Sequence, residues 1–252
     1  MRFVVLLSLI FNSMLAGAQY RHFDNFEMQL GFKNHKATPG RFEYEYNNDT
    51  VSIGRGVNLG PPDMQVLIGA GMEFEIKNNI YLAVKGEYNL TNERGGGAQL
   101  GAGYRLKLNY FMRLQPELLL SWGMLVDTIG VTSPSASPFR INDITFWPNY
   151  EIVSFYKTQY YGVQPKLSLV AEFASNWEFR YTMMYQVNFV YNQAVQLRGN
   201  ISPTQDVRTS VPFRSEFMTT TFDGEPLTKP LYRSSGFTVR AGFAYKFPLN
   251  RR

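Results

Sequence analysis

The two histidines, His22 and His35, are the side chains in this sequence best suited to acid–base chemistry. A histidine beside a serine or an aspartate could activate a nucleophile or transfer a proton. No histidine cluster, nucleophile elbow or phosphate-binding glycine loop accompanies them. The chain has no cysteine, which excludes disulfides, thiolate metal sites and thiol catalysis. We therefore expect His35 to be an ordinary solvated residue, and we predict no catalytic, cofactor-binding or metal-binding residue.

Charged residues offer a second kind of chemistry, because many of them alternate with apolar residues in short segments. Side chains that alternate in this way share one face of a strand. Buried charges must be paired, so we expect these residues to form a network of ion pairs. A narrow path for ions along the same face is the alternative. The residues predicted for this network are Glu73, Glu75, Lys85, Glu87, Arg105, Lys107, Glu178, Arg180 and Arg240.

Aromatic rings are concentrated between residues 146 and 161, in a connection between two such segments. Amphipathic rings are typical of protein interfaces, and rigid folds display binding residues on their loops. We therefore predict that Trp147, Tyr150, Phe155 and Tyr156 bind a partner. The same rings could instead fold back over the neighbouring structure or lie at a lipid interface.

Eight segments with a hydrophobic period of two must position these side chains. In the clearest one, an apolar face begins with Trp177 and Phe179, and a polar face begins with Glu178 and Arg180. Pro165 is expected to interrupt the hydrogen-bond ladder of its strand. The predicted strands are 26–33, 64–77, 80–90, 98–110, 116–126, 163–173, 177–192 and 237–247.

The connections between these strands alternate between short and long. Short turns are predicted at 77–79, 114–115 and 175–176, and longer loops at 34–63, 91–97, 130–162 and 193–236. This layout is typical of an eight-stranded antiparallel barrel with turns at one end and loops at the other.

The apolar face is predicted to point outward, toward lipid. A barrel of eight strands has an interior just wide enough for its side chains, and a stack of aromatic rings would not fit there. The polar face mixes glycines with charges of both signs, which suits a narrow packed lumen. A soluble barrel with its apolar face inside is the alternative.

The N-terminal residues 1–18 have the three-part form of a secretory signal peptide, with Arg2, an apolar stretch and the small residues Ala16, Gly17 and Ala18. No apolar run approaches the roughly 20 residues that a membrane helix needs. The formal net charge of +5 is spread along the chain, so nucleic acid is not an expected partner.

The signal peptide, the eight alternating segments and the closing strand that ends at Phe247 resemble the OmpA/OmpX-like outer-membrane β-barrel superfamily. The resemblance implies an all-β fold for residues 19–252, an eight-stranded antiparallel up-and-down transmembrane β-barrel with short periplasmic turns and long outer loops. It also implies insertion by the barrel assembly machinery and contact with outer-membrane lipid and lipopolysaccharide. In this chain Phe247 is followed by residues 248–252, whereas such proteins end on the aromatic residue.

The expected function is that of a non-enzymatic protein of the cell outer membrane whose outer loops bind other envelope proteins, as an accessory subunit of a complex. The alternatives are a lipid A hydrolase or acyltransferase that uses His35, and a narrow channel.

Overall fold

The computed structural model describes residues 23–34, 36–37, 40–48, 51–59, 64–77, 79–90, 94–132, 138–148, 150–202, 204–228, 232–233 and 235–247. The predicted signal peptide and both histidines lie outside these ranges. Regular structure in the described ranges consists of β-strands. None of the described residues forms a helix long and apolar enough to cross a membrane.

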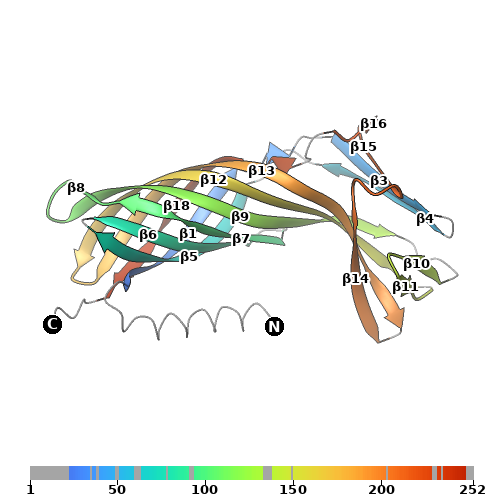
Figure 1. The fold of residues 1–252 in the computed structure, drawn as a ribbon, viewed down its shortest axis with the longest axis horizontal. Coiled ribbons are helices and arrows are strands. Elements are labelled where there is room, and N and C mark those ends of the chain that lie inside the picture. The colour runs from blue at the N-terminus through green and yellow to red at the C-terminus, as the bar shows by residue number, and fades with distance from the viewer. Residues whose placement is uncertain are drawn as a thin grey trace.

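Eight antiparallel strands form a closed ring in the described part of the chain (Figure 1). Their order is β12, β13, β18, β1, β5, β6, β7 and β9, and β9 pairs with β12 to complete the ring. Each of the eight predicted segments overlaps one of these strands, although the predicted strand 98–110 runs past Tyr104, where β7 ends. Their bounds are β1 Phe23–Asn34, β5 Met64–Lys77, β6 Ile80–Asn89, β7 Arg94–Tyr104, β9 Met112–Thr132, β12 Ile152–Ala174, β13 Trp177–Ser202 and β18 Gly236–Lys246.

Polar side chains point into the ring and apolar side chains point out of it, as predicted. On β1, Glu27 and Gln29 are buried, whereas Met28 and Leu30 are about half exposed. The same split holds at most positions around the ring, where the period of two places alternate residues on opposite faces, although Leu119, Leu125 and Val170 also point inward. The ring therefore has a polar interior and an apolar exterior, which is the reverse of a soluble barrel.

Two interior glycines make room for buried tyrosines. A Cβ atom on Gly123 would lie 2.5 Å from the ring of Tyr160, and one on Gly103 would lie 2.5 Å from the ring of Tyr81. Both glycines face the lumen from strands next to those that carry the tyrosines. The interior is thus filled by pairing the smallest residue with a large one.

Pro165 interrupts one ladder of its strand, as predicted. The pairing of β12 with β13 passes from Val163 and Val187 directly to Lys166 and Met184. On the other side, Pro165 remains paired with Leu118 of β9. The missing N–H of proline explains why the ladder breaks on one side.

Short turns join the strands at one end of the ring, which we call the short-turn end. One of them differs from the prediction. Leu114 and Gln115 lie inside β9, and the chain turns instead between the short strand β8 (Leu106–Lys107) and Met112. The Asn109 side chain accepts hydrogen bonds from the backbone N–H groups of Phe111 and Met112, and this local bonding fixes the turn there.

Strands occupy the long connections that were predicted to be loops. They gather at the end of the ring away from β8 (Figure 1), and we call this region the lobe. It includes the ends of β9, β12 and β13 that extend beyond the ring. Its other strands are β3 Gly40–Asn48, β4 Val51–Leu59, β10 Phe139–Ile141, β11 Ile144–Phe146, β14 Gln205–Pro212, β15 Met218–Phe222 and β16 Glu225–Pro226. Two further short strands, β2 (Lys36–Ala37) and β17 (Tyr232–Arg233), pair with each other.

The lobe has its own hydrophobic core. Phe42 of β3 lies against Tyr156 of β12 and stacks on Phe213, with ring centroids 6.0 and 5.8 Å apart. A bulge at Tyr191 shifts the alternation of β13, so that Val195 and Leu197 point into this core. The lobe therefore combines an extended wall of the ring with a small separate sheet of β16, β15, β3 and β4. The remaining buried core residues are Tyr44, Tyr46, Ile53, Ile129, Ile141, Phe146, Ile152, Val211 and Met218.

Candidate functional site

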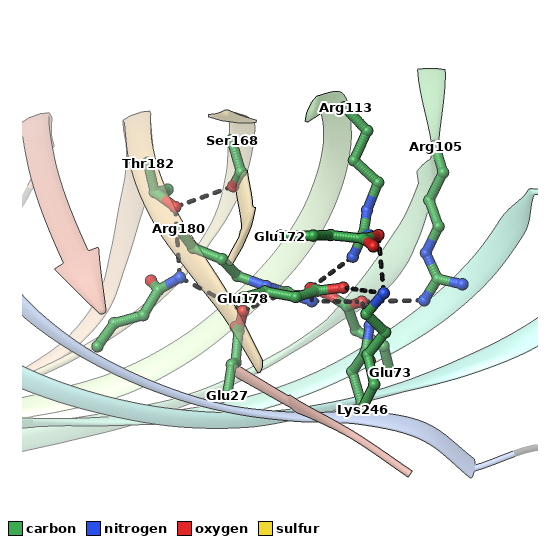
Figure 2. Close-up of polar contacts among 12 residues, drawn as sticks. Glu27, Glu73, Arg105, Arg113, Ser168, Glu172, Glu178, Arg180, Thr182 and Lys246 are labelled. Atoms are coloured by element: carbon green, nitrogen blue, oxygen red, sulfur yellow. Dashed lines mark hydrogen bonds and ion pairs between the residues drawn. The ribbon is translucent and has the colours of Figure 1, made fainter. Parts of the chain in front are cut away.

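Arg180 is the centre of the charged network inside the ring (Figure 2). It is fully buried on β13 and donates to Glu27 of β1 at 2.7 Å. It also pairs with Glu73 of β5, and with Glu178 two residues away on its own strand at 3.1 Å. One guanidinium thus holds carboxylates from three strands, which its five donors in a planar fork allow.

Two lysines continue the network across the lumen. The Nζ atom of Lys85 lies 2.7 Å from Glu27 and 2.8 Å from Glu117. The Nζ atom of Lys166 lies 2.9 Å from the same Glu117. Glu117 was absent from the prediction because its strand carries Leu119 on the inward face, which weakens the polar pattern there.

At the short-turn end, arginines and a lysine form the rim of the network (Figure 2). Arg113 pairs with Glu178 at 2.5 Å and with Glu172 at 2.8 Å, and Lys246 also lies 2.7 Å from Glu172. Arg105 pairs with Glu73 at 3.0 Å, and its guanidinium also lies 4.7 Å from the centre of the Tyr81 ring. The rim thus ties Arg105 and Arg113, on either side of the β8–β9 turn, to β5, β12 and β13, and it ties β18 to β12.

A second cluster lies toward the lobe. Arg240 pairs with Glu87, and Gln99 donates to the same carboxylate at 2.7 Å. Lys33 donates to Gln186 at 2.9 Å. These side chains are buried, so the polar filling continues along the lumen.

Two residues predicted for the network lie at its edge or outside it. Glu75 is partly exposed and lies 3.5 Å from Arg105. Lys107 does not lie in the lumen as predicted, because β8 carries it past Tyr104, where the pairing of β6 with β7 ends, and it is exposed. The other seven predicted residues, Glu73, Lys85, Glu87, Arg105, Glu178, Arg180 and Arg240, take part in the ion pairs described above.

The predicted partner-binding rings are divided by the lobe core. Trp147 and Tyr150 are 44% and 36% exposed, and the Trp147 backbone N–H donates to Asn200 of β13 at 2.5 Å. Tyr156, predicted to meet a partner, is instead buried in the lobe core, where its hydroxyl donates to Gln193 at 2.7 Å. Phe155 lies on the opposite face of β12 and is partly exposed. Adjacent strand residues point to opposite faces, so Phe155 and Tyr156 cannot belong to one surface.

The interior of the ring is polar and buried. Carboxylates and cations lie in close pairs, and large side chains fill the space between the strands. Among the described residues, no group of three or more His, Asp or Glu side chains is arranged to hold a metal ion.

No protein-family model matches the chain, and no curated protein matches it. Among solved structures, it is similar to the outer membrane protease OmpT from Escherichia coli, with 12% identity and a TM-score of 0.39 over 89% of this chain and 98% of that one. It is also similar to a major outer membrane protein from Thermus thermophilus, with 7% identity and a TM-score of 0.45 over 89% and 99% of the two chains. At these identities and TM-scores, membership of the OmpA/OmpX-like superfamily stays a prediction.

Proposed function

We propose that the ring is an up-and-down transmembrane β-barrel of the bacterial outer membrane, that it has no enzymatic activity, and that its lobe binds another envelope protein as an accessory subunit. The observation that carries the membrane assignment is the apolar exterior of the ring. Soluble monomers rarely expose apolar patches of more than a few hundred Å², whereas here apolar residues face outward on all eight strands. Lipid is the solvent that fits such a wall.

The height of the apolar wall fits a bilayer. On β13, exposed rings and aliphatic side chains follow one another at every second position from Trp177 to Phe189. At about 3.3 Å per residue and a tilt of about 40°, this stretch spans roughly 30 Å, close to the thickness of a hydrocarbon core. Aromatic residues mark both ends, with Tyr110, Phe173 and Trp177 at the short-turn end and Trp122, Tyr161 and Phe189 near the lobe.

The membrane assignment predicts a strong effect of charge on the outer wall. Leu118 of β9 is 58% exposed near the middle of this wall. Leu118→Arg is expected to destabilise the folded barrel by roughly 2–4 kcal/mol, the cost of an arginine near the bilayer midplane. The protein is refolded into lipid vesicles at a series of urea concentrations. The measurement is the fraction of protein that is folded at each concentration.

The matched control is Thr128→Arg, because Thr128 lies exposed on the same strand but in the lobe. It is expected to change the stability by less than about 0.5 kcal/mol. Equal stability of the two arginine variants would mean that the wall does not face hydrocarbon.

The filled lumen disfavours the channel alternative. The Arg180 network and the Arg240 cluster occupy the interior of the ring. Beyond the ring, the lobe core packs against the inward face of β12. The enzyme alternative depended on His35, which lies outside the described residues.

The exposed rings of Trp147 and Tyr150 support the partner-binding part of the proposal. The neighbouring Phe146 is buried in the lobe core, and a Cβ on Gly199 would lie 2.9 Å from its ring. This anchor, together with the Trp147 hydrogen bond to Asn200, holds the backbone that carries the Trp147 ring, which lowers the entropic cost of binding through that ring.

Replacing Trp147 and Tyr150 with alanine should release the partner and leave the barrel inserted. Loss of a hot-spot ring costs about 2 kcal/mol or more, which weakens binding roughly thirtyfold. The measurement is the stoichiometry of proteins that co-purify after mild-detergent extraction from the native outer membrane. Tyr110→Ala is the control, since Tyr110 is an exposed ring at the opposite end. An unchanged complex would argue against this surface, and a protein that purifies alone would argue against the accessory role.

A further inference from the structure

The outer wall beside the lobe carries three aromatic side chains in a single row. Tyr161 of β12 pairs in register with Trp122 of β9 on one side and with Phe189 of β13 on the other. All three rings are 50–55% exposed, and those of Tyr161 and Phe189 stack with centroids 5.6 Å apart. Amphipathic rings in such a row are typical of the boundary between hydrocarbon and headgroups.

The next exterior row toward the lobe carries two amides, beside Met124 of β9. Gln159 of β12 pairs in register with Asn192 of β13, and the side-chain Nδ2 of Asn192 donates to the side-chain Oε1 of Gln159 at 2.8 Å. The bulge at Tyr191 keeps Asn192 on the outer face after the alternation of β13 has shifted. The NH₂ group of Gln159 takes no part in this hydrogen bond and can donate to a ligand.

The third row places a cation at the same face. Lys157 of β12 pairs in register with Val126 of β9 and with Ala194 of β13. The same row continues to Arg94 at the start of β7, which pairs with Val126. The register neighbours of Lys157 in its own row and in the two adjacent rows, within the described strands β9, β12 and β13, carry no acidic side chain on this face.

The spacing of these rows matches a lipid headgroup. Lys157 is four residues from Tyr161, which is roughly 13 Å along the strand and about 10 Å along the membrane normal. Ring, amide and ammonium thus follow one another from the hydrocarbon boundary into the headgroup layer. An anionic lipid presents acyl chain, polar linkage and phosphate in this same order.

We infer that Trp122, Tyr161, Phe189, Gln159, Asn192 and Lys157 form a binding site for the phosphate-bearing headgroup of an anionic membrane lipid. The inference depends on the proposed membrane insertion of the ring. The rings pack on the upper part of the acyl chains, the Gln159 amide donates to the linkage or sugar, and Lys157 pairs with the phosphate.

The test uses the full chain refolded into vesicles of phosphatidylcholine alone and of phosphatidylcholine mixed with phosphatidylglycerol. Extraction followed by native mass spectrometry counts the anionic lipids that each barrel retains. Lys157→Ala is expected to lower the apparent affinity for phosphatidylglycerol at least about tenfold, the effect of losing a hydrogen bond to a charged group. Lys107→Ala, which removes an exposed lysine at the short-turn end, is expected to leave it unchanged.

The outcomes separate the two proposals. The lipid site would be overturned if the wild type and Lys157→Ala retained the same amount of phosphatidylglycerol. It would also be overturned if Lys157→Ala and Lys107→Ala lost this lipid to the same extent. Either result would leave the barrel in the membrane. Competition by inorganic phosphate as strong as that by the lipid would assign the site to free phosphate and would also overturn it. Failure of the wild-type chain to enter either vesicle would instead overturn the membrane proposal on which the site rests.

Discussion

Arg180→Met is expected to destabilise the barrel strongly, so that only a small fraction of the protein molecules folds. The substitution removes the guanidinium that pairs with Glu27, Glu73 and Glu178, and it leaves these carboxylates buried with too few cations. Removal of one partner from a buried ion pair costs roughly 3–5 kcal/mol, because the remaining charge stays uncompensated. The measurement is the temperature at which the folded protein unfolds in detergent, followed by the band shift between unheated and heated samples on a denaturing gel.

The matched control is Arg198→Met, which removes another arginine of β13. Arg198 pairs with Asp206 at 2.6 Å, but both side chains are about 40% exposed. Surface pairs contribute about 0–1 kcal/mol, so this variant is expected to unfold close to the wild type. In addition, Glu73→Gln combined with Arg180→Met should recover part of the loss. Similar unfolding temperatures for Arg180→Met and Arg198→Met would show that the network does not stabilise the barrel.

Phe42→Ala is expected to open the lobe and leave the ring folded. The Phe42 ring is fully buried between Tyr156 and Phe213, and its removal leaves a cavity where β3 meets the extended wall. Truncation of a buried phenylalanine costs roughly 3–5 kcal/mol. When the variant is inserted in vesicles, limited proteolysis should therefore cut the chain within 40–59 and 205–226, while the ring strands remain protected.

Phe217→Ala controls for the loss of an aromatic ring in the same region. Phe217 is 42% exposed and its ring centroid lies 6.2 Å from that of Tyr46 at the margin of the core. A change of about 1 kcal/mol or less is expected, with little added cleavage. If Phe42→Ala resists protease as well as Phe217→Ala does, the lobe does not depend on this core.

The sequence predicted the ring well because the ring obeys one rule. A wall with a polar inner face and an apolar outer face must alternate at every residue, so Glu27 beside Met28, or Arg180 beside Phe179, is enough to assign both faces. The rule is local and needs no knowledge of which strands are neighbours. Glu117 was missed where Leu119 breaks it, and Lys107 was misplaced because alternation does not tell where the neighbouring strand ends.

The strands of the lobe lie in segments predicted to be loops, although part of the lobe follows the same rule. Phe42, Tyr44 and Tyr46 alternate with Glu43 and Glu45, which is the pattern of a half-buried strand. Most of the residues that cover them are far away in the sequence, in 129–156 and 195–218, so no local feature indicates these contacts. The bulge at Tyr191 changes the inward-facing set of β13, and only the pairing with β12 reveals that change.

The pairing of β1 with β18 has a consequence for how the chain must be made. These strands are joined along most of their length, from Asn25 with Lys246 to Lys33 with Thr238, although they lie at opposite ends of the described sequence. Among the described strands, the last to be synthesised is therefore the one that removes the free edges of β1 and β13. A chain that ends before Gly236 keeps two unpaired strand edges. In lipid, their backbone N–H and C=O groups lack hydrogen-bond partners, and in water they pair with strands of other molecules. Premature termination before β18 is therefore expected to yield a protein that aggregates or is degraded, and not a smaller folded barrel.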